Sequence, residues 1–138
     1  MDDRRTFSVL ASFRLDGDCA VVTGGGKGLG RIACLALAEA GAKVAVLDLD
    51  ETTAQQTVGE IAEAGGEARS WVCDVTDEAS MDAVFAEIGE TWGKLDFVVH
   101  AIAYSDKDEL KGQYVDTSRA NFQRSLDISC FSFTEACR

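Results

Sequence analysis

The residues with the clearest chemical purpose form a glycine-rich loop between an apolar run and a helical pattern. The loop reads Thr-Gly-Gly-Gly-Lys-Gly-Leu-Gly over residues 23–30, and Gly28-x-Gly30-x-x-Ala33 fits the G-x-G-x-x-G/A pattern. Glycines let the main chain approach a pyrophosphate, and the amino end of the following helix presents unpaired N–H groups and a positive dipole. No G-K-[ST] sequence follows, which excludes a phosphate-loop NTPase. The loop therefore predicts a bound nucleotide, contacted by Gly24, Gly28, Leu29 and Gly30.

An acidic residue closes the next apolar run. Asp48 lies 20 residues beyond Gly28, where a carboxylate accepts hydrogen bonds from ribose hydroxyls and repels a 2′-phosphate. Asp48 and the adjacent Leu49 are therefore predicted cofactor residues, and NAD(H) is favoured over NADP(H). The alternative is a glycine-rich turn beside an unrelated surface aspartate. Lys27, within the loop, is either a phosphate contact or a solvated lysine.

A second candidate carboxylate follows the third apolar run. Asp74 and Val75 come directly after residues 68–73, at the edge where open α/β sheets bind their ligands. Asp74 is a candidate partner for an adenine amino group, and both residues are predicted to contact the cofactor. Capping of the next helix is the alternative role for Asp74.

The remaining reactive side chains form no metal-binding or disulfide pattern. His100 is the single histidine, and the five cysteines contain no C-x-x-C pair. We expect no metal site, and free thiols are typical of a reducing cytoplasm. His100 stands at a strand end and is interpreted as a buried, hydrogen-bonded histidine rather than a general acid.

The elements that would position these residues alternate between strand and helix. Apolar runs predict strands at 19–23, 43–48, 68–73 and 95–100, and helical spacing predicts helices at 28–40, about 54–62 and 81–92. Thr76 or Asp77 is the expected cap of the third helix. This alternation predicts an α/β fold, a Rossmann-type doubly wound parallel sheet with strand order 3-2-1-4. A last helical face, interpreted mainly as core, carries Phe122, Leu126, Cys130, Phe133 and Cys137.

Length and charge limit the organisation of the chain and its partners. The 138 residues suit one globular domain, with 1–17 as a tail and lead-in and 18–138 as the NAD-binding domain. Because the last helical pattern reaches Arg138 without a stop signal, we expect the N-terminal part of a larger single domain. A net charge of −11 argues against nucleic acid and anionic membranes as partners. No apolar run approaches the roughly 20 residues of a membrane span, and a cytoplasmic location is expected.

These motifs identify a resemblance to the short-chain dehydrogenase/reductase superfamily over residues 13–76. The glycine loop, Asp48 and Cys73-Asp74-Val75 carry it. From about residue 81, the chain is similar to the bacterial NADH-dependent enoyl-acyl-carrier-protein reductases, in segments 92–102, 105–112, 114–119 and 127–134. That branch usually has a longer, serine-containing loop and no acid where Asp48 stands. The two halves therefore resemble two related branches.

The second resemblance implies NADH-dependent reduction of an enoyl-acyl-carrier-protein thioester in fatty acid biosynthesis. Hydride would reach the β-carbon, and a tyrosine and a lysine with six residues between them would hold the resulting enolate. That pair is expected beyond Arg138. Tyr104 and Lys111 have the same spacing but precede the helix in question, so we assign them no catalytic role.

The resemblance also implies roles for the segment after the fourth strand. Ala101 and Ile102 match positions at the nicotinamide end of the cofactor, and Ser105 matches a substrate-facing position. Loop packing is the alternative for all three. The full-length protein would be a homo-oligomer, and its acidic carrier partner would meet a basic patch, for which the candidates are Lys107, Lys111, Arg119 and Arg124.

Two alternative functions remain open at the level of the sequence. The first half favours a 3-oxoacyl-acyl-carrier-protein reductase or another NAD-dependent alcohol dehydrogenase, acting on a small carbonyl substrate. The other alternative is a non-catalytic NAD-binding fragment. The Tyr-x-x-x-Lys spacing of the superfamily does not occur in the chain, which favours this alternative.

Overall fold

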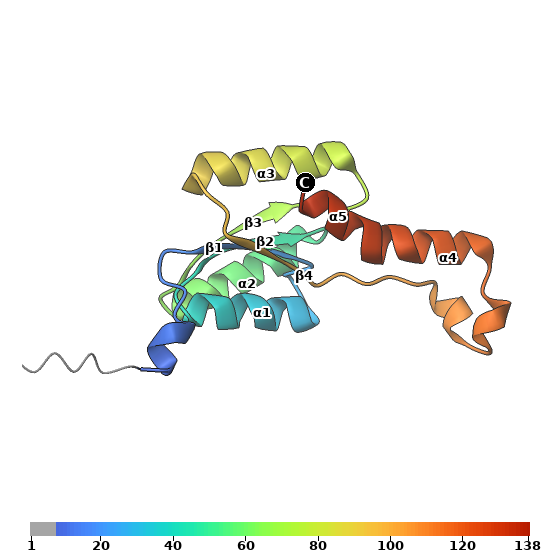
Figure 1. The fold of residues 1–138 in the computed structure, drawn as a ribbon, viewed down its shortest axis with the longest axis horizontal. Helices are drawn as coiled ribbons and strands as arrows, with labels where there is room; N and C mark the ends of the chain where they lie inside the picture. Colours follow the sequence, from blue (N-terminus) through green and yellow to red (C-terminus); the bar gives the residue numbers. More distant parts are fainter. Residues whose placement is uncertain (1–7) are drawn as a thin grey trace, which may run out of the picture.

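The fold is a four-stranded parallel sheet with helices on both faces (Figure 1). The computed structural model describes residues 8–138, so residues 1–7 of the expected tail lie outside the described part. The strand order is β3-β2-β1-β4, which confirms the predicted fold class and topology. The strands are β1 (Cys19–Thr23), β2 (Lys43–Asp48), β3 (Glu67–Val72) and β4 (Phe97–His100).

Three long helices cover the two faces of the sheet. Helices α1 (Gly28–Glu39) and α2 (Glu51–Glu63) lie on one face, and α3 (Glu78–Trp92) lies on the other (Figure 1). The core has two parts because the side chains of each strand alternate between the faces. Val22, Val44 and Val46 pack toward α1 and α2, whereas Val21, Ala45 and Leu47 pack toward α3.

Burial differs between the central and the edge strands. Every residue of β1 is buried, and only the two end residues of β2 are half-buried. β3 contains exposed and half-buried residues and no buried one, and β4 is half-buried throughout. Continuous burial is therefore found only in the strands that have a neighbour on both sides.

The helix boundaries follow from local capping. The side chain of Asp50 accepts from Thr53 N–H at the start of α2, and that of Asp77 accepts from Ala79 N–H at the start of α3. Asp77, and not Thr76, is therefore the cap of α3. Gly93 ends α3 in a left-handed conformation, with φ of 71°.

The last helical segment is not the core element that its apolar spacing predicts. Helix α4 (Arg119–Leu126) passes through a π-helical turn (Asp127–Phe131) into α5 (Ser132–Ala136). All five residues of the predicted stripe are exposed, and Asn121, Ser132 and Ala136 are buried in their place. The prediction was wrong for two reasons. The π turn breaks the 3.6-residue period, and α4 projects beyond the sheet together with the loop after β4 (Figure 1).

Several smaller differences concern loops and strand ends. A 3-10 helix (Leu10–Phe13) lies in the expected tail, and two more (Lys107–Leu110 and Tyr114–Asp116) lie in the segment after β4. β3 and β4 each differ by one or two residues from the predicted bounds, whereas β1 and β2 match them.

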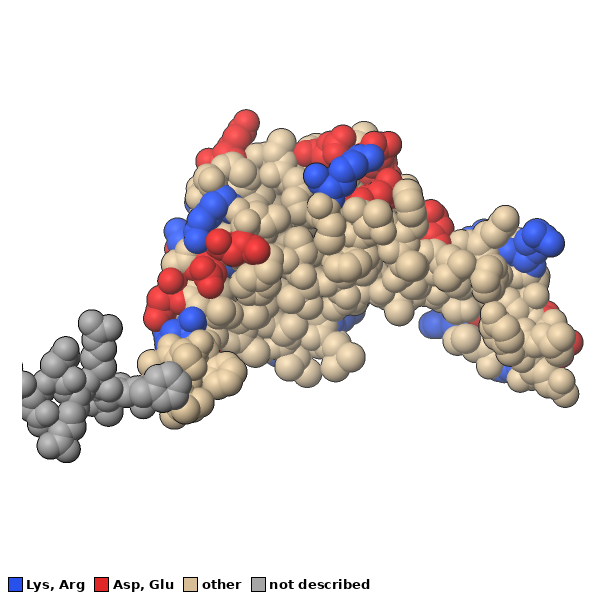
Figure 2. Space-filling view, in the orientation of Figure 1, with Lys and Arg blue, Asp and Glu red and all other residues tan. Residues whose placement is uncertain are grey.

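The visible face has an uncharged area at its lower middle. Figure 2 shows charged side chains at both ends of this face and along its upper middle, and an uncharged area where β4 lies in Figure 1. β4 pairs only with β1, so its other edge is free among the described residues. Within residues 8–138, no helix combines the length and apolar character needed to cross a membrane.

Candidate functional site

The glycine loop joins β1 to α1 at the carboxyl edge of the sheet and packs too closely for side chains. Gly24 has φ of +68°, and a Cβ there would lie 2.8 Å from the carbonyl oxygen of Ala101. A Cβ on Gly30 would overlap the carbonyl oxygen of Gly24. These two glycines therefore allow the first turn of α1 to lie directly on the loop and on the segment after β4.

Gly28 is different because it faces open space. Its φ is +54°, and no atom lies within 4 Å of a Cβ built there. Lys27 is the N-cap of α1 and makes no capping hydrogen bond, whereas α2, α3 and α4 all have side-chain caps. The first N–H groups of α1 therefore have no side-chain partner among the described residues. This open, uncapped helix start fits a phosphate group.

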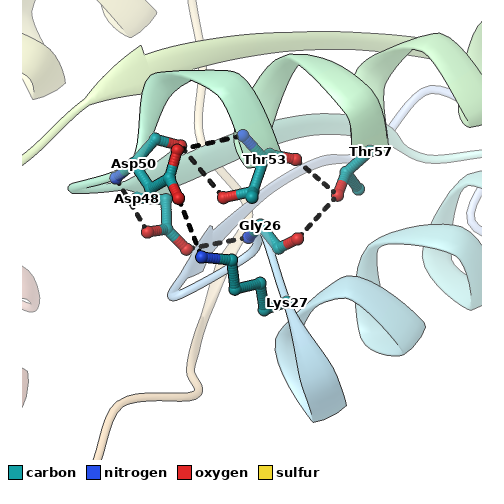
Figure 3. A network of polar contacts seen from close by, with 6 residues as sticks. All are labelled: Gly26, Lys27, Asp48, Asp50, Thr53 and Thr57. Atoms are coloured by element: carbon teal, nitrogen blue, oxygen red, sulfur yellow. Dashed lines mark hydrogen bonds and ion pairs between the residues drawn. The ribbon is translucent and has the colours of Figure 1, made fainter.

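Asp48 lies beside the glycine loop, as the sequence predicts. Its Oδ2 accepts from the main-chain N–H of Gly26 at 2.9 Å, and its Oδ1 accepts from that of Asp50 at 3.0 Å (Figure 3). Each carboxylate oxygen can accept a further hydrogen bond. The end of β2 thus presents an anchored, half-buried carboxylate next to the loop.

Lys27 makes an ion pair that the sequence did not predict. Its Nζ lies 2.7 Å from Oδ2 of Asp50, and this contact lowers the pKa of Asp50 and raises that of Lys27 (Figure 3). In this structure the ammonium group is therefore held by the carboxylate of Asp50 beside the glycine loop. The Lys27 side chain is 67% exposed and that of Asp50 is 43% exposed, so the pair contributes little to stability.

Thr57 is a buried site residue that sequence reasoning missed. Its hydroxyl lies 3.1 Å from the carbonyl oxygen of Gly25. Figure 3 shows its contacts with the carbonyl oxygens of Gly26, at 3.4 Å, and Thr53, at 3.2 Å. The two glycine contacts tie α2 to the glycine loop. The only signal was a hydroxyl on the apolar face of a helix, between Ala54 and Ile61.

The two predicted apolar contacts are exposed at this edge. Leu29 is 82% exposed and Leu49 is 67% exposed. Large apolar side chains at such exposure are available to a ligand. Val75 differs, because its side chain is buried in the core with Met81, which leaves its main chain for any contact.

Asp74 organises a turn between β3 and α3. Its Oδ1 accepts from the N–H of Thr76 at 2.9 Å and from the Thr76 hydroxyl at 2.7 Å. These hydrogen bonds lower the pKa of Asp74. The carboxylate therefore closes a local turn rather than capping α3, and it remains at the ligand edge of the sheet.

The segment after β4 brings two predicted residues to the glycine loop. The N–H of Ala101 donates to the carbonyl oxygen of Thr23 at 3.1 Å. The Ile102 side chain packs against Gly24, because a Cβ on that glycine would lie 3.0 Å from Ile102 Cγ1. Ala101 and Ile102 are therefore adjacent to the loop.

Ser105 lies further along and bonds to a buried amide. The Nδ2 of Asn121 donates to the Ser105 hydroxyl at 3.2 Å, and Asn121 Oδ1 accepts from the N–H of Asp106 at 2.8 Å. Ser105 also lines a groove of about 420 Å³ between the projecting loop and α4, together with the apolar residues Leu110, Tyr114, Phe122 and Leu126. Sequence reasoning missed Asn121, because its partners in the loop, Ser105 and Asp106, lie 16 and 15 residues away.

The other reactive groups give no second site at this edge. A larger groove, of about 660 Å³, lies at the amino ends of the strands, away from the glycine loop, and includes Gly17, Lys43 and Glu67. Burial raises the pKa of Cys34 to about 12 and that of Cys73 to about 11, so both thiols are protonated at neutral pH. In the described part of the chain, no cluster of three His, Cys, Asp or Glu residues could hold a metal ion. Tyr104 and Lys111 are exposed loop residues.

Comparison with known proteins assigns the chain to a family. A family model described as enoyl-(acyl carrier protein) reductase matches residues 24–138. The chain belongs to this family. The enoyl-[acyl-carrier-protein] reductase [NADH] 1 of Rhizobium meliloti is 56% identical over 99 residues, which are 72% of this chain and 36% of that protein.

Solved structures of both related branches resemble this member of the enoyl-(acyl carrier protein) reductase family. The enoyl-(acyl-carrier-protein) reductase of Anaplasma phagocytophilum, in complex with NAD, matches with a TM-score of 0.77 and 45% identity, over 88% of this chain and 47% of that one. A hydroxysteroid dehydrogenase from Escherichia coli matches with a TM-score of 0.81 and 33% identity, over 91% and 52%. The chain thus spans between about a third and a half of the length of these relatives.

Proposed function

We propose that the carboxyl edge of the sheet binds NADH. The observation that carries this proposal is Asp48, fixed beside a glycine loop that opens an uncapped helix. The pyrophosphate would lie on Gly28 and the first turn of α1, where the main chain is accessible and the helix dipole is positive. The spare lone pairs of Asp48 would accept from the adenosine ribose hydroxyls, and its charge would disfavour a 2′-phosphate.

The other predicted residues complete this proposed site. Leu29 and Leu49 would cover apolar faces of the nucleotide, and Asp74 with the Val75 main chain would lie toward the adenine. Ala101 and Ile102, beside Gly24, would lie toward the nicotinamide. Lys27 would leave Asp50 if it contacts a phosphate, which costs little because the pair is exposed.

For the whole protein, we propose NADH-dependent reduction of an enoyl-acyl-carrier-protein thioester. The identity of 56% with an enoyl reductase supports this substrate class. Bound NADH would supply the hydride. Within this chain, Ser105 and the apolar groove beside it would face the acyl substrate. We propose that the tyrosine and lysine that hold the enolate lie outside these 138 residues.

A second candidate reaction is supported by the first half of the chain. The E. coli 7alpha-hydroxysteroid dehydrogenase is 34% identical over 88% of this chain, and Asp48 suits an NAD-dependent alcohol or 3-oxoacyl dehydrogenase. In that reaction hydride would be exchanged with a carbonyl carbon instead of an alkene carbon.

Thioester assays separate these reactions. A protein that joins this chain to a catalytic segment with the tyrosine and lysine is given NADH and either crotonyl- or acetoacetyl-thioester. We expect NADH oxidation with the crotonyl compound. Turnover of the acetoacetyl compound alone would favour the dehydrogenase. Turnover of either thioester by the 138-residue chain itself would contradict the placement of the tyrosine and lysine elsewhere.

A further inference from the structure

His100 connects three elements at the carboxyl edge of the sheet. It ends β4 and is half-buried. Its Nδ1 lies 2.8 Å from the hydroxyl oxygen of Thr23, at the end of β1, and its Nε2 lies 2.9 Å from that of Ser132, at the start of α5. Thr23 and Ser132 are both buried. The sequence interpretation of a hydrogen-bonded histidine is therefore confirmed, and both of its partners are hydroxyl groups.

The geometry assigns the proton on the imidazole. The Ser132 hydroxyl lies 2.6 Å from the carbonyl oxygen of Ile128, which can only accept, so the single serine proton points there. The Ser132 oxygen must therefore accept from Nε2–H. In a neutral imidazole the other nitrogen is then an acceptor, so Nδ1 accepts a hydrogen bond from the Thr23 hydroxyl.

The surroundings of the ring favour this neutral form. Its neighbours are the Thr23 hydroxyl from β1, the Ile128 carbonyl from the π-helical turn, and the Ser132 hydroxyl and Phe133 ring from α5. The centres of the His100 and Phe133 rings are 5.5 Å apart. Among residues 8–138, no carboxylate or cation is hydrogen-bonded to the imidazole from any of these elements. Burial lowers the pKa of His100.

The residues tied together by His100 are those that shape the proposed nucleotide site. Thr23 directly precedes Gly24, and its carbonyl oxygen accepts from Ala101 N–H. In the π-helical turn, the Ser129 hydroxyl accepts from the N–H of Tyr104 at 2.9 Å, which holds the loop after β4. A shift of the turn would therefore move both the glycine loop and the segment at Ala101.

We propose that His100, as the neutral Nε2–H tautomer, is a positioning residue that holds the π-helical turn against the ends of β1 and β4. Its role in ligand binding rests on the proposed NADH site. Protonation would make both ring nitrogens donors, so Thr23 would lose its acceptor and the connection to β1 would loosen.

Because His100 is the only histidine in the chain, its ring nitrogens can be observed without ambiguity by long-range ¹H–¹⁵N NMR of the free protein. We expect a protonated Nε2, an unprotonated Nδ1 and a pKa below about 6.5. A protonated Nδ1, or titration at the ordinary value, would overturn the proposal.

Variants at Thr23 separate positioning from simple packing. Thr23→Val keeps the shape but removes the hydroxyl proton, and Thr23→Ser restores it. We expect faster amide hydrogen exchange at Ala101 and in residues 127–131 in Thr23→Val, with return toward the wild-type rates in Thr23→Ser. Equal protection in all three proteins would overturn the proposal without reference to any ligand.

NADH titrations then test the link to the site. One lost hydrogen bond predicts about three- to tenfold weaker NADH binding in Thr23→Val. Because burial lowers the pKa of His100 from its ordinary value of about 6.5, wild-type affinity should fall only as the pH drops below about 6.5. The non-titrating His100→Gln should lose this pH dependence. Wild-type affinity that is independent of pH would contradict the positioning role. Absence of NADH binding at every pH would refute the proposed function, while the tautomer and exchange results would still decide the positioning role.

Discussion

The carboxylate of Asp48 is anchored on two main-chain N–H groups and still has lone pairs to offer. Asp48→Ala should therefore weaken NADH binding by about ten- to a hundredfold, the range expected for hydrogen bonds to a charged group. NADPH binding should weaken much less or improve, because the charge that repels a 2′-phosphate is removed. Calorimetric titration with both cofactors measures the two effects.

Glu90→Ala is the matched control for Asp48→Ala. It removes an exposed carboxylate from α3, on the other face of the sheet, and changes the net charge by the same amount. We expect unchanged affinity for both cofactors. If Asp48→Ala behaves like Glu90→Ala, Asp48 is not part of the binding site.

Substitutions of Gly28 and Gly30 should have different effects on the protein. Gly28→Ala adds a methyl group in open space at φ of +54°, so we expect a stability loss of about 1 kcal/mol and loss of NADH binding. Gly30→Ala forces a methyl group onto the Gly24 carbonyl oxygen, so the protein itself should be destabilised by several kcal/mol. Urea denaturation and NADH titration of each variant test this. Normal NADH binding by Gly28→Ala would show that the pyrophosphate lies elsewhere.

At the scale of the elements, apolar side chains on two helices have opposite surroundings. Ile88 on α3 is 1% exposed, whereas Phe122 on α4 is 45% exposed. Ile88→Ala should cost about 2–5 kcal/mol of unfolding free energy, the usual range for buried large-to-small changes. Phe122→Ala should cost less than about 1 kcal/mol in the monomeric chain. Urea titrations at low protein concentration compare them, and equal losses would contradict the exposed position of α4.

The elements also show what the sequence can and cannot predict. β1, the glycine loop and Asp48 were predictable because strand, turn and helix start are local signals within residues 19–48. The stripe on α4 was misread because apolar spacing does not reveal whether anything lies opposite it. The partners Thr23, His100 and Ser132 were not predictable as a group, since they are 32 or more residues apart and meet only through strand order and the π turn.

At the scale of the whole molecule, acid should destabilise the fold in two steps. The folded pKa of His100 is lowered by burial, so the unfolded chain binds a proton first and stability falls as pH drops through about 6.5. The pKa values of Asp50, Asp74 and Asp96 are lowered by hydrogen bonds from Lys27, Thr76 and Lys94, so their contribution is present above about pH 4 and is lost below it.

Urea midpoints measured from pH 8 to pH 3 would show both steps. His100→Gln should remove the first step and leave the second. A midpoint that stays constant from pH 8 to pH 5 in the wild type would contradict a neutral His100 with a lowered pKa.

The central claim is that NADH binds where β1 passes into α1. The most direct measurement is a calorimetric titration of the folded chain with NADH and, separately, NADPH. The account predicts one NADH per chain and NADPH binding at least about tenfold weaker, because Asp48 would face the 2′-phosphate. No heat of binding with NADH, from protein shown to be folded by circular dichroism, would contradict it.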